Sequence, residues 1–404
     1  MSGRDEQAGP GRGLMYDWRK KLLAVLERVE PRIDRLKLHL KLRRGRLGPV
    51  GIVPYSGYGT RWQQRLKGRV LEERKIRLPA RNDPAWRNFR AMVRRFLSAE
   101  VPGARVRVRF GDEDRTFVAD NEGFVDVALE SGRATPKHRE WHQVELELLW
   151  PMAEGQKEVR TTGRVLVPPP DAGFAVISDI DDTIVRTEAT NLLRMLRLTL
   201  FSNAYTRLPF EGVAAFYRAL HEGGNGGAGN PIFYVSTGPW NLYDLLEDFL
   251  RLQNIPAGPI FLKDWGGLKD VLRGMNHREH KLGVIRGIME DYPDLPFVLI
   301  GDSGQEDAET YGQISREYPG RVRAVYIRDV QNKRRSQAVC EIAEEMQAFK
   351  IPMLLVDDTV EAAKHAAEEK LISEASLPEI RQGREEDAEG ETVLSSIVRA
   401  GIGT

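Results

Sequence analysis

Three aspartates lie within four residues, and their spacing suggests chemistry. Asp179, Asp181 and Asp182 follow a short apolar segment, and Thr183 comes next. Carboxylates this close repel one another and raise each other's pKa unless a cation or hydrogen bonds offset the repulsion. A divalent metal ion would offset it most simply, while a solvated acidic turn is the alternative. A calcium loop is excluded, because the sixth and twelfth positions from the first aspartate hold isoleucine and threonine instead of glycine and glutamate.

The segment before these aspartates predicts the element that positions them. Residues 174–177 are apolar and follow the three loop-forming prolines 168–170, so we predict a buried parallel strand. Strand patterns then alternate with helix patterns. The strands are predicted at 232–235, 297–300, 322–327 and 353–356, and the helices at 212–221, 242–252, 281–291 and 362–369. This alternation predicts a mostly parallel sheet with helices on both faces, whose ligands bind beyond the carboxyl ends of the strands.

Further polar side chains fall at or near those carboxyl ends. Ser236 ends one predicted strand and Thr237 follows it, Lys281 lies near the start of a predicted helix, and Asp302 and Asp307 lie in the loop after the next strand. A serine there could instead cap the following helix. Any basic residue of the group 277–281 could be a surface charge. The position of Lys281 one helix before the acidic loop favours it as the functional one.

The order, type and strand position of these residues resemble the haloacid dehalogenase superfamily of phosphohydrolases. The segments SDIDDTI, VSTGPWNLYDLLEDFL and LIGDSGQEDAETY, with SGYGT upstream, resemble more closely the actin-patch-associated phosphatidate phosphatases and their bacterial relatives. The catalytic resemblance covers about residues 171–330, and the β-rich region before it matches the layout of that family.

The resemblance implies a role for each catalytic position. Asp179 would be the nucleophile that forms an aspartyl-phosphate, and Asp181 would protonate the leaving oxygen and later activate water. Thr183 would fix the loop by a hydrogen bond. Ser236 and Lys281 would bind the phosphoryl oxygens, with the neighbouring threonine at 237 as the alternative hydroxyl.

The resemblance also implies a magnesium site. Asp179, Asp302 and the backbone carbonyl of Asp181 would hold Mg²⁺ together with waters, which suits an ion that prefers few carboxylates. Asp307 and Asp182 would be outer partners of these ligands.

The region before the prolines predicts a different architecture. Residues 1–13 are expected to be a disordered leader, and residues 16–29 a basic amphipathic helix that either docks on the protein or lies on anionic lipid. Leucines at every second position of 36–42 predict a half-buried strand. More strands are predicted at 50–55, 68–71, 106–110, 124–129, 144–149 and 163–167, with one helix at 85–98. Strands this dense suggest a β-sandwich of the immunoglobulin or lipid-binding type.

We therefore divide the chain into four parts. They are a leader and basic helix (1–31), a β-rich sandwich-like domain (32–170), an α/β catalytic domain with a haloacid-dehalogenase-like sheet (171–374) and a mobile tail (375–404). The insertion 188–209 mixes leucine and arginine, which suits either a phosphorylated lipid head group or a core-facing helix.

Composition sets limits on location and partners. The 60 Lys and Arg residues nearly balance the 59 Asp and Glu, so the charge of the whole chain does not indicate nucleic acid, and we expect no such partner. The single Cys340 suits a reducing compartment. There is no apolar run of about 20 residues, so we expect a cytoplasmic protein whose membrane contact, if any, is peripheral.

The resulting hypothesis is a magnesium-dependent phosphatase acting on phosphatidate or a related phospholipid to release diacylglycerol. One alternative is the same chemistry on a soluble phosphate ester or a phosphoprotein. Another is a membrane or cytoskeletal adaptor with a vestigial catalytic domain, although vestigial copies usually lose the nucleophile or the metal ligands, which stand here.

Overall fold

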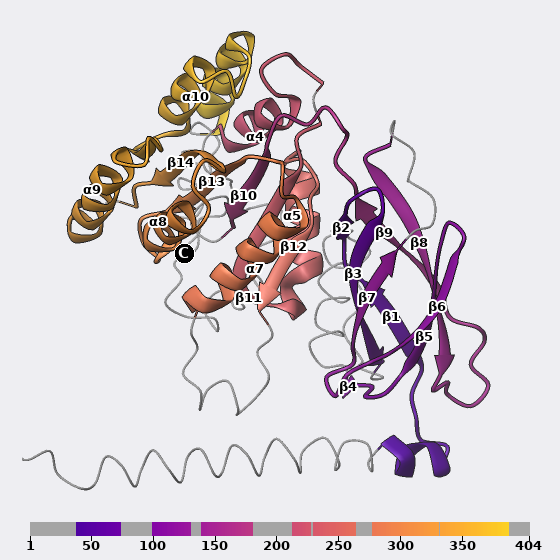
Figure 1. The fold of residues 1–404 in the computed structure, drawn as a ribbon. Coiled ribbons are helices and arrows are strands. Elements are labelled where there is room, and N and C mark those ends of the chain that lie inside the picture. Colours follow the sequence, from indigo (N-terminus) through magenta and orange to yellow (C-terminus); the bar gives the residue numbers. More distant parts are fainter. Residues whose placement is uncertain are drawn as a thin grey trace, which may run out of the picture.

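The computed structural model describes residues 38–73, 99–130, 139–180, 212–227, 229–263, 277–330 and 332–387 (Figure 1). Several sequence predictions lie outside these ranges and are not tested: the basic helix at 16–29, the helix at 85–98, the insertion 188–209, and the three residues Asp181, Asp182 and Thr183. Among the helices of the described ranges, none is both long and apolar enough to cross a bilayer.

Residues after the triple proline form a six-stranded parallel sheet. Its order is β12-β11-β10-β13-β14-β15, with every neighbouring pair parallel. The strands are β10 (Ala175–Asp179), β11 (Ile232–Pro239), β12 (Ile260–Lys263), β13 (Phe297–Asp302), β14 (Val322–Arg328) and β15 (Met353–Val356). The chain moves outward in one direction from β10 and then resumes in the other direction at β13. In sheets of this kind, ligands usually bind in a crevice at the point of such a reversal, here beyond the carboxyl ends of β10 and β13.

Helices cover both faces of this sheet, as the sequence predicts. One face packs on α4 (Val213–Glu222), α5 (Tyr243–Leu252) and α10 (Thr359–Glu368), and the other on α7 (His277–Asp291), α8 (Asp307–Glu317) and α9 (Lys333–Gln347). Successive residues of β10 alternate between the two cores, since Val176 faces the first and Ala175 and Ile177 the second. Because both faces are buried, the strand must be apolar throughout, which explains its unbroken hydrophobic run.

The β-rich region forms one mixed sheet of nine strands. They are β1 (Val50–Pro54), β2 (Gly57–Gly59), β3 (Gln63–Glu72), β4 (Ala99–Glu100), β5 (Arg105–Phe110), β6 (Glu113–Val118), β7 (Phe124–Glu130), β8 (Trp141–Trp150) and β9 (Arg160–Leu166). All six strands predicted between residues 50 and 167 are present. The structure differs from the predicted sandwich of two separate sheets. The parallel pairing of β2 with β9 joins the strands into one hydrogen-bonded sheet. Side chains of β3, β7, β5 and β8 still share a single core, so the sheet curls around it.

Two further predictions differ from the structure. Residues 38–43 are helical, so the strand predicted from the alternating leucines at 36–42 is wrong. Leu38 and Leu42 lie one helical turn apart and face the core, whereas Leu40 is 40% exposed; a spacing of four fits the alternation as well as a spacing of two. Residues 377–387 are also helical, so ordered structure extends into the part predicted as a mobile tail.

Two tyrosines of the β-rich region pack against the β11–β12 edge of the parallel sheet. Tyr55 packs on Trp240 and Tyr243 at ring distances of 4.4 and 4.7 Å, within the core on the α5 face. Tyr58 packs on Phe261 at 5.4 Å within the core on the α7 face, and its hydroxyl donates a hydrogen bond to Asp291. Tyr55 and the segment SGYGT that follows it therefore dock the two domains, and β2 and β3 lie beside the parallel sheet (Figure 1).

Candidate active site

Two of the predicted aspartates meet at the crevice between β10 and β13. Asp179 is the last residue of β10 and Asp302 the last residue of β13, and these strands are adjacent and in parallel register. Parallel neighbours end at the same edge, so the two carboxylates are brought together by the strand order alone. Their side chains are almost completely buried, at 1% and 0% exposure.

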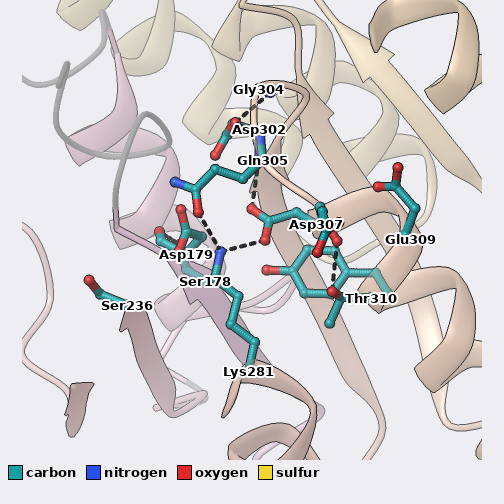
Figure 2. A network of polar contacts seen from close by, with 12 residues as sticks. Ser178, Asp179, Ser236, Lys281, Asp302, Gly304, Gln305, Asp307, Glu309 and Thr310 are labelled. Carbon is teal, nitrogen blue, oxygen red and sulfur yellow. Dashed lines mark hydrogen bonds and ion pairs between the residues drawn. The ribbon is translucent and has the colours of Figure 1, made fainter. Parts of the chain in front are cut away.

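Lys281, on α7, extends into the same site. Its Nζ lies 2.8 Å from Asp179 Oδ1 and 2.5 Å from Asp307 Oδ1, and it donates a longer hydrogen bond of 3.3 Å to the side chain of Gln305 (Figure 2). Burial alone would lower the pKa of Lys281, but the carboxylates of Asp179 and Asp307 outweigh burial and raise that pKa above its ordinary value. The lysine is therefore a fixed cation that holds the carboxylates in place.

Asp302 keeps one oxygen without a donor. Its Oδ1 accepts hydrogen bonds from the backbone N–H groups of Gly304 and Gln305, at 2.6 and 2.9 Å. Its Oδ2 is buried and accepts none within the described part of the chain. Burial, followed by the charge of Asp307, raises the pKa of Asp302 to about 7. A buried carboxylate oxygen that accepts no hydrogen bond can instead be satisfied by binding a cation.

The donor set fits a hard divalent ion. Carboxylate oxygens of Asp179, Asp302 and Asp307 lie within 4.8 Å of one another, and all three residues are buried. Lys281 offsets only part of this charge. Oxygen ligands supplied by one or two carboxylates are those that Mg²⁺ prefers, so the residues present can hold it.

Asp307 is already occupied at both oxygens. Oδ1 pairs with Lys281, and Oδ2 accepts a hydrogen bond of 3.2 Å from the backbone N–H of Asp302. These contacts favour the predicted role of Asp307 as an outer partner. Its place depends on Gly301, where an added Cβ would lie 2.6 Å from Asp307 Oδ2 and 2.8 Å from the ring of Tyr311.

We expect Gly301→Ala to displace Asp307 and to lower kcat by about 10²-fold, because a shift of about 1 Å at a catalytic constellation has an effect of that size. Overpacking should also destabilise the fold by about 1–3 kcal/mol. The matched control is Gly287→Ala on α7, where an added Cβ meets nothing within 4 Å and alanine favours the helix. Kinetics and thermal unfolding of both variants measure the difference. Equal kinetics would show that the close approach at Gly301 is not needed.

Ser236 lies on the other neighbour of β10. The order β11-β10-β13 places Asp179 between the strand of Ser236 and the strand of Asp302 (Figure 2). Ser236 is buried, and its Oγ accepts a hydrogen bond of 2.9 Å from the backbone N–H of Gly238. The serine therefore shapes its turn, and its preference over Thr237 as a phosphate ligand stays a prediction.

The structure adds side chains that the sequence analysis did not assign. Gln305 accepts a hydrogen bond from Lys281. It lies in the segment LIGDSGQEDAETY, but no role was predicted for it. Tyr217 on α4 is hydrogen-bonded to Ser178 at 2.6 Å, and Ser178 donates to the carbonyl of Asp179 at 2.7 Å. No local pattern signals Tyr217, because its partner is 39 residues away. Arg278, a competitor of Lys281 in sequence, points elsewhere and donates to Gln313.

Comparison with known proteins gives a family match over the same region. Residues 174–329 match the family model described as phosphatidate phosphatase APP1, catalytic domain. The phosphatidate phosphatase APP1 of Saccharomyces cerevisiae is 35% identical over 162 residues, which cover 40% of this chain and 26% of that protein. An uncharacterized protein of Schizosaccharomyces pombe is 29% identical over 162 residues, covering 39% and 25%. These matches confirm the resemblance indicated by the motifs, and the chain spans about a quarter of the length of both yeast proteins.

Similarity to solved structures is weaker. A β-glucuronidase of Bacteroides uniformis is 9% identical and aligns over 83% of this chain and 45% of that chain, with a TM-score of 0.24. A carbohydrate acetylesterase of Xanthomonas citri is 14% identical over 72% of each chain, with a TM-score of 0.23. Scores this low carry no argument about fold or activity.

Proposed function

We propose, from the match of residues 174–329 with the APP1 catalytic domain, that this chain is a magnesium-dependent phosphatase of the haloacid dehalogenase type. The observation that supports this most is the buried carboxylate of Asp179, paired with buried Lys281 at the carboxyl end of a parallel strand. A carboxylate paired with a buried cation at this position is suited to act as a nucleophile.

The proposed reaction has two steps. Asp179 attacks the phosphorus, the bond to the ester oxygen breaks, and the leaving oxygen takes a proton from Asp181. A water molecule then attacks the aspartyl-phosphate, gives a proton back to Asp181, and releases inorganic phosphate and the Asp179 carboxylate. Asp181 lies outside the described residues, so its role rests on the resemblance, as do those of Thr183 and Asp182.

Lys281 would bind a phosphoryl oxygen, with Ser236 or Thr237 on the opposite side of Asp179. Asp179, Asp302 and the backbone carbonyl of Asp181 would hold Mg²⁺, which when bound stabilises the negative charge of the phosphoryl oxygens. Asp307 would keep Lys281 and the backbone of Asp302 in position. Hydrolysis of phosphate monoesters is extremely slow without a catalyst, and charge stabilisation on several sides is what it requires.

The proposed substrate is phosphatidate, which is supported by the name of the yeast relative. Soluble phosphate esters and phosphoproteins are the alternatives with the same chemistry. The adaptor alternative is disfavoured, because vestigial copies usually lose such residues and Asp179, Asp181, Lys281 and Asp302 are all present in the sequence. Cytoplasmic location and peripheral membrane contact stay predictions.

We expect the protein to release phosphate from phosphatidate in mixed micelles with Mg²⁺ and to lose that activity when EDTA is added. Re-addition of Mg²⁺ should restore it. Phenyl phosphate, assayed beside phosphatidate, separates the substrate classes. Turnover of phenyl phosphate alone would retain the phosphatase and discard the lipid, whereas turnover that is unaffected by EDTA would contradict the metal.

A further inference from the structure

Basic side chains that this mechanism does not use gather beside the site, at the boundary between the two domains. Lys67 on β3 comes from the β-rich sheet, and its Nζ lies 5.5 Å from the ring centre of Trp240. Lys263 is the last residue of β12 and pairs in register with Pro239. Both lysines therefore lie next to the turn that Ser236 opens at the carboxyl edge of the parallel sheet.

His280 on α7 lies near both lysines. It precedes Lys281 on α7, and its Nε2 is buried without a hydrogen-bond partner in the ranges that the structure describes. Burial, and then the charges of Lys263, His277, Lys281 and Lys67, lower the pKa of His280 to about 4. The imidazole is thus neutral at physiological pH, because it is largely buried and basic side chains from three elements lie near it.

Within the ranges that the structure describes, little negative charge opposes these basic side chains. Lys67 has an ion pair of 3.5 Å with Asp126, whose side chain is 75% exposed, and pairs this exposed contribute little. The acidic side chain of the first turn of α7 is Glu279, which is exposed to solvent. Asp179 and Asp307 of the catalytic cluster are already paired with Lys281. A group of cations whose ion pairs are weak, beside a buried ring nitrogen with no hydrogen-bond partner among the described residues, is typical of a site for an anion.

We propose that Lys67, Lys263 and His280 form an oxyanion subsite that binds a second negatively charged group beside the phosphoryl group being transferred. This inference rests on the proposed function and extends it, because it names phosphate monoesters with a neighbouring anion as the preferred substrate class. The neighbouring anion belongs either to the same molecule or to an adjacent lipid head group. The β-rich domain then supplies part of the substrate surface through Lys67.

The kinetic test compares carboxyphenyl phosphate, which has a second anion, with phenyl phosphate, which lacks one. The wild-type protein should prefer the former, and Lys67→Met and Lys263→Met should each lower the ratio of the two kcat/KM values by about tenfold, the expected effect of one charge-assisted hydrogen bond. Lys67→Arg should keep the ratio, as should the control Lys364→Met on the exposed side of α10. An unchanged ratio in the two methionine variants overturns the soluble form of the proposal.

The lipid form is tested with phosphatidate micelles that contain increasing phosphatidylglycerol. An activity gain from phosphatidylglycerol that Lys67→Met abolishes assigns the second anion to a neighbouring head group. If neither assay shows an effect of the substitutions, the subsite is refuted.

A binding measurement separates this proposal from the proposed function. Sodium sulfate should raise the Tm of the wild-type protein above its value in sodium chloride of equal ionic strength. The double variant Lys67→Met, Lys263→Met should lose at least half of that gain. If the wild-type protein hydrolyses no ester, the proposed function fails and the sulfate result alone decides the subsite. A full sulfate gain in the double variant overturns it.

Discussion

Asp179→Asn is expected to lower kcat by at least about 10³-fold on any substrate of the enzyme, since single nucleophile replacements have effects of this size or more. The amide of asparagine cannot attack phosphorus to form the acyl-phosphate. The fold should remain, because asparagine has the same shape and Lys281 retains its contact of 2.5 Å with Asp307. Steady-state phosphate release and thermal unfolding, measured side by side, test both parts.

The matched control for this variant is Asp248→Asn. Asp248 lies on α5, away from the crevice, and pairs with Arg251 near the surface. We expect that variant to keep wild-type turnover. Substantial turnover in Asp179→Asn, with the control unchanged, would mean that another group is the nucleophile, and the proposed mechanism would be discarded.

Lys281→Met is expected to lower the free energy of unfolding by about 3–5 kcal/mol, the usual result of removing one partner from a buried ion pair. The substitution leaves Asp179 and Asp307 buried beside Asp302 without their lysine. Turnover should fall as well, because in the proposed mechanism Lys281 binds a phosphoryl oxygen. Chemical denaturation, followed in EDTA, gives the stability, and Mg²⁺ should restore part of it by replacing the missing positive charge.

A second substitution separates stability from catalysis at this position. Lys281→Met combined with Asp307→Asn removes one charge of each sign, so we expect it to regain at least half of the stability lost in Lys281→Met, a coupling that a double-mutant cycle measures. Turnover should stay low, because the lysine is still absent. Lys364→Met serves as the control for loss of a surface lysine. Recovery of turnover in the double variant would show that Lys281 has only a structural role.

The part of the site that was predictable from sequence comes from strand ends. Asp179 and Asp302 each follow an unbroken apolar run, and parallel strands end at a common edge, so their meeting follows from local patterns and topology together. Lys281 was found by its place before the acidic loop. The role predicted for Asp307 came from the family resemblance.

The contacts that were not predicted depend on long-range packing. Tyr217 meets Ser178 across the sheet, and Gln305 turns back onto Lys281, and neither arrangement leaves a periodic signal. Gly301 looks like an ordinary loop glycine until the close approach of Asp307 is measured. Residue types alone do not report such distances.

Elements were missed or misassigned where short patterns are ambiguous. Strand β12 was not predicted, because its four residues IFLK end in a lysine, whereas the equally short β15, MLLV, is apolar throughout. The leucines at 36–42 satisfy both the strand and the helix spacing, and burial of Leu38 against exposure of Leu40 decides between them. The β-rich sheet was expected as two layers, because sequence does not show that the three residues of β2 pair with β9.

The packing of Tyr55 and Tyr58 against the parallel sheet limits where the chain can be cut without exposing its hydrophobic cores. The family match ends at residue 329 and begins at residue 174, but the cores of that sheet extend to α10 on one side and to Tyr55 and Tyr58 on the other. A fragment cut at the limits of the match would expose Phe261 and Trp240 to water and would lack strand β15. An exposed aromatic patch beside an uncovered strand edge promotes self-association. The segment that matches the family is therefore smaller than the part of the chain whose packing covers the apolar faces of this sheet.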